Sequence, residues 1–172
     1  MGLLVRAVVE RICRMGFFHR AGTKQVKIKP SEIIRGKLLA DGGYAVIKQA
    51  RGGVCQVMDC GDGKTFECDK LPVAQNYTYQ VFDIIAELLL RNGKSPKGNG
   101  RNFRFGEEKC TEDTVVGAIA KNYFGKQIGE STYDPVFALA AVLEWAGIAR
   151  NGYGYMELTP DYLAKLSENA NQ

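Results

Sequence analysis

The sequence predicts an α+β protein, and three patterns along its 172 residues lead to that fold class. Apolar residues recur at three- and four-residue intervals over residues 3–18, as on one face of an amphipathic helix. Residues 24–70 alternate between apolar and polar side chains and are interrupted by glycine pairs, which favours a small antiparallel sheet. Residues 111–160 then contain two helical segments and a hairpin. An apolar content of 45% fits a globular protein with a buried core.

The helix predicted over residues 3–18 carries its arginines away from its apolar side. Arg6, Arg11 and Arg14 interrupt the apolar sequence, so it lacks the continuous core of a signal peptide, and we expect a cytoplasmic protein. No apolar run reaches the roughly 18–20 residues that a bilayer span needs, so we expect no membrane partner. The apolar positions are Leu4, Val5, Val8, Val9, Ile12, Met15 and Phe18.

The predicted sheet contains three or four strands and one short helix. Residues 31–39 form that helix, with Ser31 as its cap. Asp62-Gly63 is a hairpin signal that joins the last two strands. If that hairpin loop covers residues 60–63, Cys55 lies opposite Cys68. The expected strands cover residues 25–29, 44–48, 54–58 and 64–68.

Three longer helices and a hairpin are predicted in the second half. Residues 79–91 have a wide apolar face, and residues 112–124 follow a group of hydroxyl and acidic residues that suits a helix N-terminus. A third helix covers residues 134–147, and Gly147 ends it. Within residues 148–159, Asn151-Gly152 tolerates the positive φ angles of a tight turn. A short terminal helix over residues 160–169 completes the prediction.

This order of helices and hairpin resembles the C-terminal part of a winged helix-turn-helix domain, over about residues 79–159. The resemblance implies a winged-helix-like domain over residues 76–172, and the patterns described above place an N-terminal helix and a small antiparallel sheet before it, over residues 1–75. In that family the third helix commonly enters the DNA major groove, and the wing touches the backbone or minor groove. The alternative is an unrelated helical bundle with a terminal hairpin.

The third helix is poorly suited to reading bases. Residues 133–147 contain no Lys, Arg, Asn or Gln, so they offer no bidentate donor to guanine or adenine. Asp134 and Glu144 would repel phosphates. We therefore expect this apolar helix to lie in the core or to dock another protein.

A cationic segment over residues 91–105 is the stronger nucleic-acid candidate. It has no acidic residue before Glu107, and its glycines would let the backbone approach a phosphate chain. Phenylalanines in it could stack on bases, and the hairpin adds one cation and one aromatic ring. The alternative is a solvated, mobile loop. The expected contacts are Lys94, Lys97, Arg101, Phe103, Arg104, Phe105, Arg150 and Tyr153.

Charge is distributed unevenly along the chain. Residues 1–51 hold eleven Lys or Arg against three acids, a net charge of +8, while residues 110–172 have a net charge of −4. We therefore expect a non-catalytic protein that binds DNA or RNA electrostatically and through the backbone. The first alternative is an interaction subunit of a larger assembly that docks through residues 134–147 or the N-terminal helix.

Signals for catalysis and metal binding are weak. Glu107 and Lys109 have the Glu-x-Lys spacing of many metal-dependent nucleases, which makes a nuclease the weaker alternative. An upstream acid such as Asp59, Asp62 or Asp83 would have to complete such a site. The spacing of Cys55, Cys60 and Cys68 differs from that of zinc ribbons. A fourth zinc ligand would have to come from Cys13, Cys110 or His19, the single histidine. We expect reduced cysteines, no cofactor, no metal site and no catalytic residues.

Overall fold

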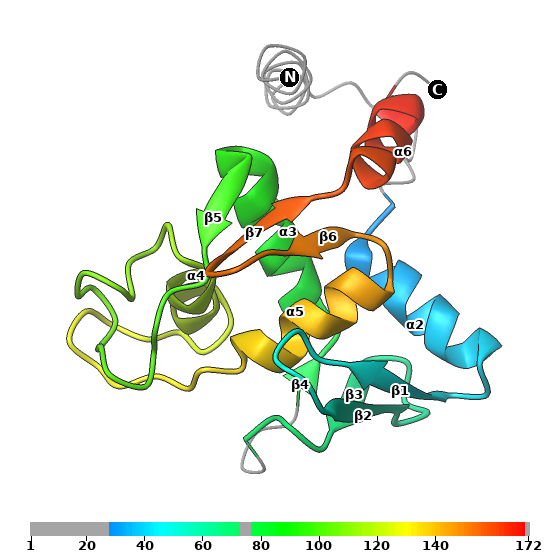
Figure 1. Cartoon of the computed structure of the whole chain (residues 1–172), viewed down its shortest axis with the longest axis horizontal. Coiled ribbons are helices and arrows are strands. Elements are labelled where there is room, and N and C mark those ends of the chain that lie inside the picture. Colours follow the sequence, from blue (N-terminus) through cyan, green and yellow to red (C-terminus); the bar gives the residue numbers. More distant parts are fainter. Residues whose placement is uncertain (1–27, 73–76, 171–172) are drawn as a thin grey trace.

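The computed structural model describes residues 28–72 and 77–170 and has an α+β fold with two antiparallel sheets (Figure 1). The helix expected over residues 3–18 and most of the strand expected at 25–29 lie outside the described residues. The described helices are α2 (Pro30–Ala40), α3 (Gln80–Asn92), α4 (Val115–Asn122), α5 (Val136–Trp145) and α6 (Pro160–Ala170). The strands are β1 (Tyr44–Lys48), β2 (Val54–Asp59), β3 (Thr65–Cys68), β4 (Tyr77–Thr78), β5 (Lys94–Pro96), β6 (Ala149–Asn151) and β7 (Tyr155–Leu158).

Sheet A has the strand order β1-β2-β3-β4 and packs one face against the helices. Alternate residues of β1 and β2 are buried, which confirms the alternation read from the sequence. The register of the β2–β3 hairpin is shifted by two residues from the expected one, because Asp59 pairs with Phe66 and not with Lys64. Cys68 therefore pairs with Val57, and the expected pairing of Cys68 with Cys55 is wrong by two positions.

The start of α2 differs from the expected cap. Pro30 occupies the first turn, and the N-cap residue Lys29 makes no side-chain cap bond. Ser31 lies inside the helix and donates from both its amide and its hydroxyl to the carboxylate of Asp83, at 2.9 and 2.8 Å. A carboxylate of α3 therefore satisfies the N-terminus of α2, so Ser31 is not the cap.

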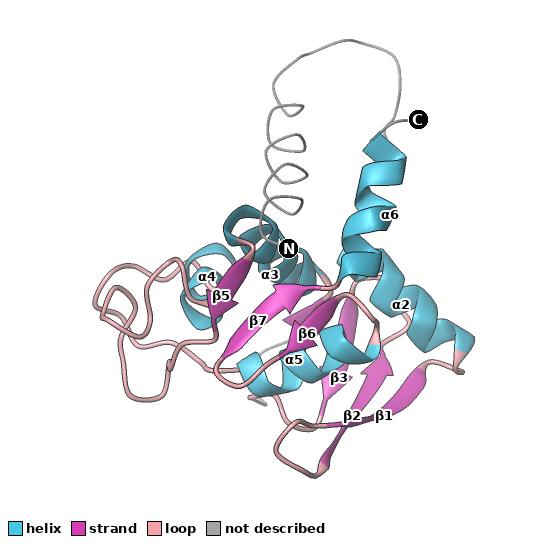
Figure 2. Cartoon of the chain, turned by 45° about the horizontal axis from the view of Figure 1, so that its top comes forward, coloured by secondary structure: helices cyan, strands magenta, loops and turns pink. Residues whose placement is uncertain are grey.

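Sheet B has the order β5-β7-β6 and lies next to α3, α4 and α5 (Figure 2). The chain order here is α3, β5, α4, α5, β6, β7, with β7 in the centre of the sheet. β5 was not expected, since it is only three residues long and ends in a proline. The side chain of Thr114 accepts from the amide of Gly117, which makes it the N-cap of α4.

Helix α5 lies in the core, as its composition predicted. Seven of its ten residues are buried, and α2 and β1 pack against it. The guanidinium of Arg51 lies 4.8 Å from the ring centroid of Phe137, and the ammonium of Lys37 lies 4.4 Å from that of Trp145. The N-terminal elements of this chain therefore cover the helix that the winged-helix resemblance would assign to the major groove.

Buried apolar residues from both halves of the chain form one cluster. β4, just past the boundary expected at residues 75 and 76, supplies the fourth strand of sheet A. In the part of the chain that the structure describes, no helix is both long enough and apolar enough to cross a bilayer.

Candidate nucleic-acid interface

The outer face of sheet B presents a cross-strand row of charged side chains. Lys94 of β5 pairs with Glu157 of β7, which pairs in turn with Arg150 of β6. Strands lie about 4.8 Å apart, so the backbones carrying the two cations are roughly 10 Å apart. An Arg150 guanidinium nitrogen is 3.6 Å from a Glu157 carboxylate oxygen, and this partly exposed pair leaves Lys94 without an acidic partner among the described residues.

Two tyrosines border this row. The ammonium of Lys94 lies 3.4 Å from the ring centroid of Tyr155, a cation–π contact that orients the lysine and leaves its charge in place. Tyr153 sits in the turn between β6 and β7 with 92% of its surface exposed. Because so much of the ring is exposed, it does not pack against the described residues and is available to a ligand.

The loop between β5 and α4 is irregular but anchored (Figure 1). The amide of Asn99 donates to the carbonyl of Lys109 at 2.7 Å, and the amide of Phe105 donates to the carbonyl of Glu130 at 3.0 Å. Gly98 has a φ of +78°, and a Cβ there would lie 2.6 Å from a methyl carbon of Val116. The glycine is therefore needed for close packing on α4, in addition to any approach of a ligand.

Two arginines extend from this loop into solvent. The Asn99 side chain accepts from the amide of Arg101 at 3.2 Å and forms a turn that presents Arg101, whose guanidinium has no bonding partner in the described chain. The Arg104 guanidinium donates to the carbonyl of Gly129 at 3.1 Å and retains its charge. Neither arginine is neutralised by a carboxylate within residues 28–72 and 77–170.

Lys97 takes a different position from the other expected contacts. Only 7% of it is exposed, and its ammonium donates to the side-chain oxygen of Asn151 and, at 2.8 Å, to the carbonyl of Gly152. Burial lowers the pKa of Lys97, with the charge of Arg51 adding to that effect and Glu144 opposing it. Lys97 therefore joins the start of the loop to the β6–β7 turn, and two of its three ammonium hydrogens are already bonded there.

The two phenylalanines of the loop also differ. Phe105 is only 3% exposed and belongs to the core cluster, where stacking on a base is blocked by its neighbours. Phe103 is half-buried, with the ammonium of Lys109 at 5.5 Å from its ring centroid. Of the eight expected contacts, Lys94, Arg150 and Tyr153 come together on sheet B, and Arg101, Phe103 and Arg104 lie on the loop that follows.

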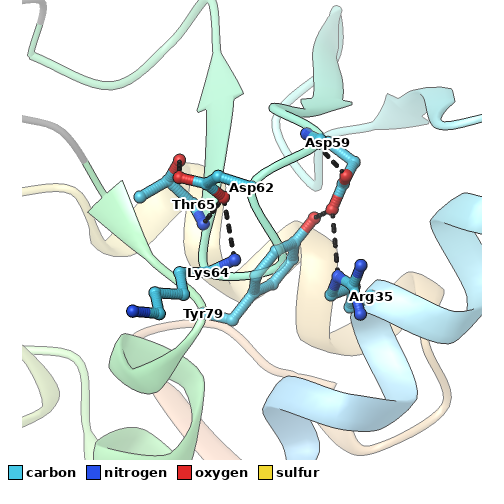
Figure 3. Close-up of polar contacts among 7 residues, drawn as sticks. Arg35, Asp59, Asp62, Lys64, Thr65 and Tyr79 are labelled. Atoms are coloured by element: carbon cyan, nitrogen blue, oxygen red, sulfur yellow. Dashed lines mark hydrogen bonds and ion pairs between the residues drawn. The ribbon is translucent and has the colours of Figure 1, made fainter.

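The acids considered for a nuclease are engaged elsewhere. Asp59 accepts from the Tyr79 hydroxyl at 2.7 Å and lies 3.4 Å from the Arg35 guanidinium, while Asp62 accepts from Lys64 and Thr65 (Figure 3). Glu107 accepts from the amide of Arg104 at 2.6 Å, and Asp83 is bonded to Ser31.

A metal site is likewise not formed by the described residues. Across residues 28–72 and 77–170, His, Cys, Asp and Glu side chains form no group of three that could hold a metal ion. Cys55, Cys60, Cys68 and Cys110 are free thiols. A hydrogen bond between the Cys55 and Cys68 thiols raises the pKa of Cys55 and lowers that of Cys68. Cys13 and His19, considered as ligands above, lie outside the described residues.

Comparison of the chain with family models, curated proteins and solved structures gives no match.

The contact between Lys94 and Tyr155 was not expected from the sequence. The two side chains become neighbours through the pairing of β5 with β7, in which Pro96 lies opposite Tyr155. Residues 94–96 were expected to be irregular, so nothing in the sequence indicated that pairing.

Proposed function

We propose that the protein binds nucleic acid without catalysis, through the outer face of sheet B and the loop that follows β5. The proposal rests chiefly on four exposed cations, of which only Arg150 has a carboxylate partner: Lys94, Arg101, Arg104 and Arg150. Cations presented in this way displace condensed counterions from a phosphate backbone, which is the main source of non-specific affinity. Tyr153 and Phe103 would supply stacking contacts.

The chain order of α3 to β7 and the sheet order β5-β7-β6 support a winged-helix-like arrangement for this half of the molecule. The proposed binding mode departs from the usual one, because α5 is covered by sheet A and α2. We therefore propose contact through the hairpin and loop, directed at the backbone of DNA or RNA. The free thiols accord with a cytoplasmic location, which we include in the proposal.

A charge-neutral variant tests this surface. The variant K94Q/R101Q/R104Q/R150Q removes four positive charges. Three of them make one contact each, namely an ion pair, a cation–π contact and a hydrogen bond to a carbonyl, and all of these contacts lie at the surface. Binding of a fluorescent mixed-sequence duplex, measured by anisotropy at about 0.1 M salt, should weaken roughly 100-fold. The same measurement on a single-stranded RNA determines which polymer is preferred.

The matched control removes the same number of charges elsewhere. K48Q/K64Q/K70Q/K121Q changes four exposed lysines outside sheet B and its loop. It should bind within about threefold of the unmodified chain, because surface charges beyond a Debye length of about 10 Å are screened. Equal losses in the two variants would mean that only net charge matters and would remove the assigned surface.

A second candidate function, an interaction subunit, is favoured by the outer face of sheet A. This face exposes four apolar side chains, Tyr44, Val46, Val54 and Met58. β1 is the edge strand, so antiparallel pairing with β1 of a second copy would continue the sheet. Light scattering tests self-association through this face: a dimer that V46E/M58E converts to a monomer supports it, and a monomer at all concentrations excludes pairing with a second copy.

A further inference from the structure

Helices α3 and α6 form the walls of an apolar groove of about 530 Å³. Its base includes the end of β7 and the residues that precede α2. Its principal apolar lining residues are Ile28, Ile84, Leu90, Leu158, Tyr162 and Leu166.

Helix α6 is weakly packed for its length. Tyr162 is its single buried residue, and Leu163 and Leu166 are only partly covered. An isolated helix of eleven residues is marginally stable in water, so α6 needs packing on its apolar side to persist. The residues that line the groove pack against one side of α6, and none of the described residues fills the groove itself.

We propose that residues 3–18 of the same chain occupy this groove as an amphipathic helix. The described chain begins at Ile28, which itself lines the groove, and the Tyr162 hydroxyl donates to the Ile28 carbonyl at 3.2 Å. Only nine residues, 19–27, separate this point from the segment, and they span at most about 30 Å. The short connection gives the segment a high effective concentration at the groove.

The apolar side of a helix over residues 3–18 would suit the apolar lining of the groove. In a helical conformation, Val8, Ile12 and Met15 fall on one side together with the other apolar positions, while Arg6 and Arg14 fall on the opposite side. Sixteen residues of helix are about 24 Å long, enough to cover both Ile84 and Leu90 on α3, which are two turns apart. Docking would bury the leucines of α6 and keep Arg6 and Arg14 in water.

Hydrogen exchange on the full chain tests the proposal. In the unmodified protein, amides of residues 5–16 should be protected at least 10-fold, and dilution should not reduce the protection. V8D/I12D places charges on the apolar side and should accelerate exchange of residues 163–170 at least 10-fold. Its matched control, R6D/R14D, makes an equal number of substitutions on the opposite side and should leave residues 163–170 unchanged.

The reciprocal variant keeps the test valid if V8D/I12D fails to fold. L166D in α6 should remove protection from residues 5–16 while α3 retains its own. Absence of protection over residues 5–16 in the unmodified chain would overturn the proposal, as would unchanged exchange in L166D. Protection that disappears on dilution would assign the groove to the segment of a second copy and would also overturn it.

Discussion

Sheet A and sheet B are both packed on helices along one face, but their outer faces differ in chemistry. Sheet A exposes Tyr44 and Val46 on β1, with Val46 54% exposed, and Val54 and Met58 on β2. The corresponding face of sheet B carries Lys94 and Arg150. Two sheets that share one core therefore offer an apolar and a cationic surface, and only the latter suits a polyanion.

Each sheet also has a charged side chain that is bonded within the protein and has a structural role, and the two sheets differ in its sign. Asp59 of sheet A is bonded to Tyr79, the residue just before α3, and paired with Arg35 of α2. Lys97, just after β5, joins sheet B to the β6–β7 turn. Burial and hydrogen bonding therefore show which charged side chains are structural and which are free to bind a partner. Residue type alone does not make this distinction.

The largest effect on stability is expected at Lys97. K97A leaves Asn151 and the Gly152 carbonyl without their donor and opens space in the loop, so the free energy of unfolding should fall by about 2–3 kcal/mol. K94A, three residues earlier on the exposed face, should change it by less than about 0.5 kcal/mol. Urea unfolding of both variants measures the difference, and equal effects would contradict the structural role of Lys97.

Asp59 should make the stability of the protein depend on acid pH. The Tyr79 hydroxyl holds the pKa of Asp59 below its ordinary value, burial opposes this shift, and the Gly61 amide and Arg35 reinforce it. Because the folded pKa is below the unfolded value of about 4, the stabilisation is present above pH 4 and is lost as the pH falls through the folded pKa.

D59N should therefore be less stable at pH 7 by about 1–2 kcal/mol and should show a smaller loss between pH 5 and pH 2. Urea unfolding over that range is the measurement. D161N, at an exposed position at the start of α6, serves as the control and should follow the unmodified protein. A D59N variant with an unchanged pH profile would show that Asp59 is not the titrating group.

A smaller effect is expected at Tyr153. Removing this exposed ring should weaken binding of a single-stranded oligonucleotide by about 1 kcal/mol, roughly fivefold, with no change in unfolding. Y44A removes an exposed tyrosine from the outer face of sheet A and is the matched control. If both variants bound equally well, stacking by the β6–β7 turn would be excluded.

Local patterns were sufficient for the α+β class and for most elements. Periodicity placed α3 within one residue, because seven apolar positions over four turns have no reasonable alternative to a helical face. The composition of α5 correctly indicated a buried helix. The expected start of α4 at 112 was three residues early, since the cap is Thr114, the last residue of the hydroxyl and acidic group at the start of this helix.

The site was harder to predict, because it depends on contacts between distant residues. Nothing around Lys97 in the sequence distinguishes it from Lys94; the difference comes from Asn151, 54 residues away. Phe105 was expected to stack on a base, but backbone bonds to residues 129 and 130 hold its position in the core. Helix α5 is likewise covered because the β1–β2 hairpin folds back onto it, and no local sequence pattern predicts that contact.

The salt dependence of duplex binding tests the central claim most directly. Four phosphate contacts predict a slope of about −3.6 for log K against log salt, so affinity should fall roughly 150-fold between 50 and 200 mM. In K94Q/R101Q/R104Q/R150Q the slope should approach zero. A slope near zero for the unmodified chain, or the same steep slope in the variant, would contradict binding through sheet B and its loop.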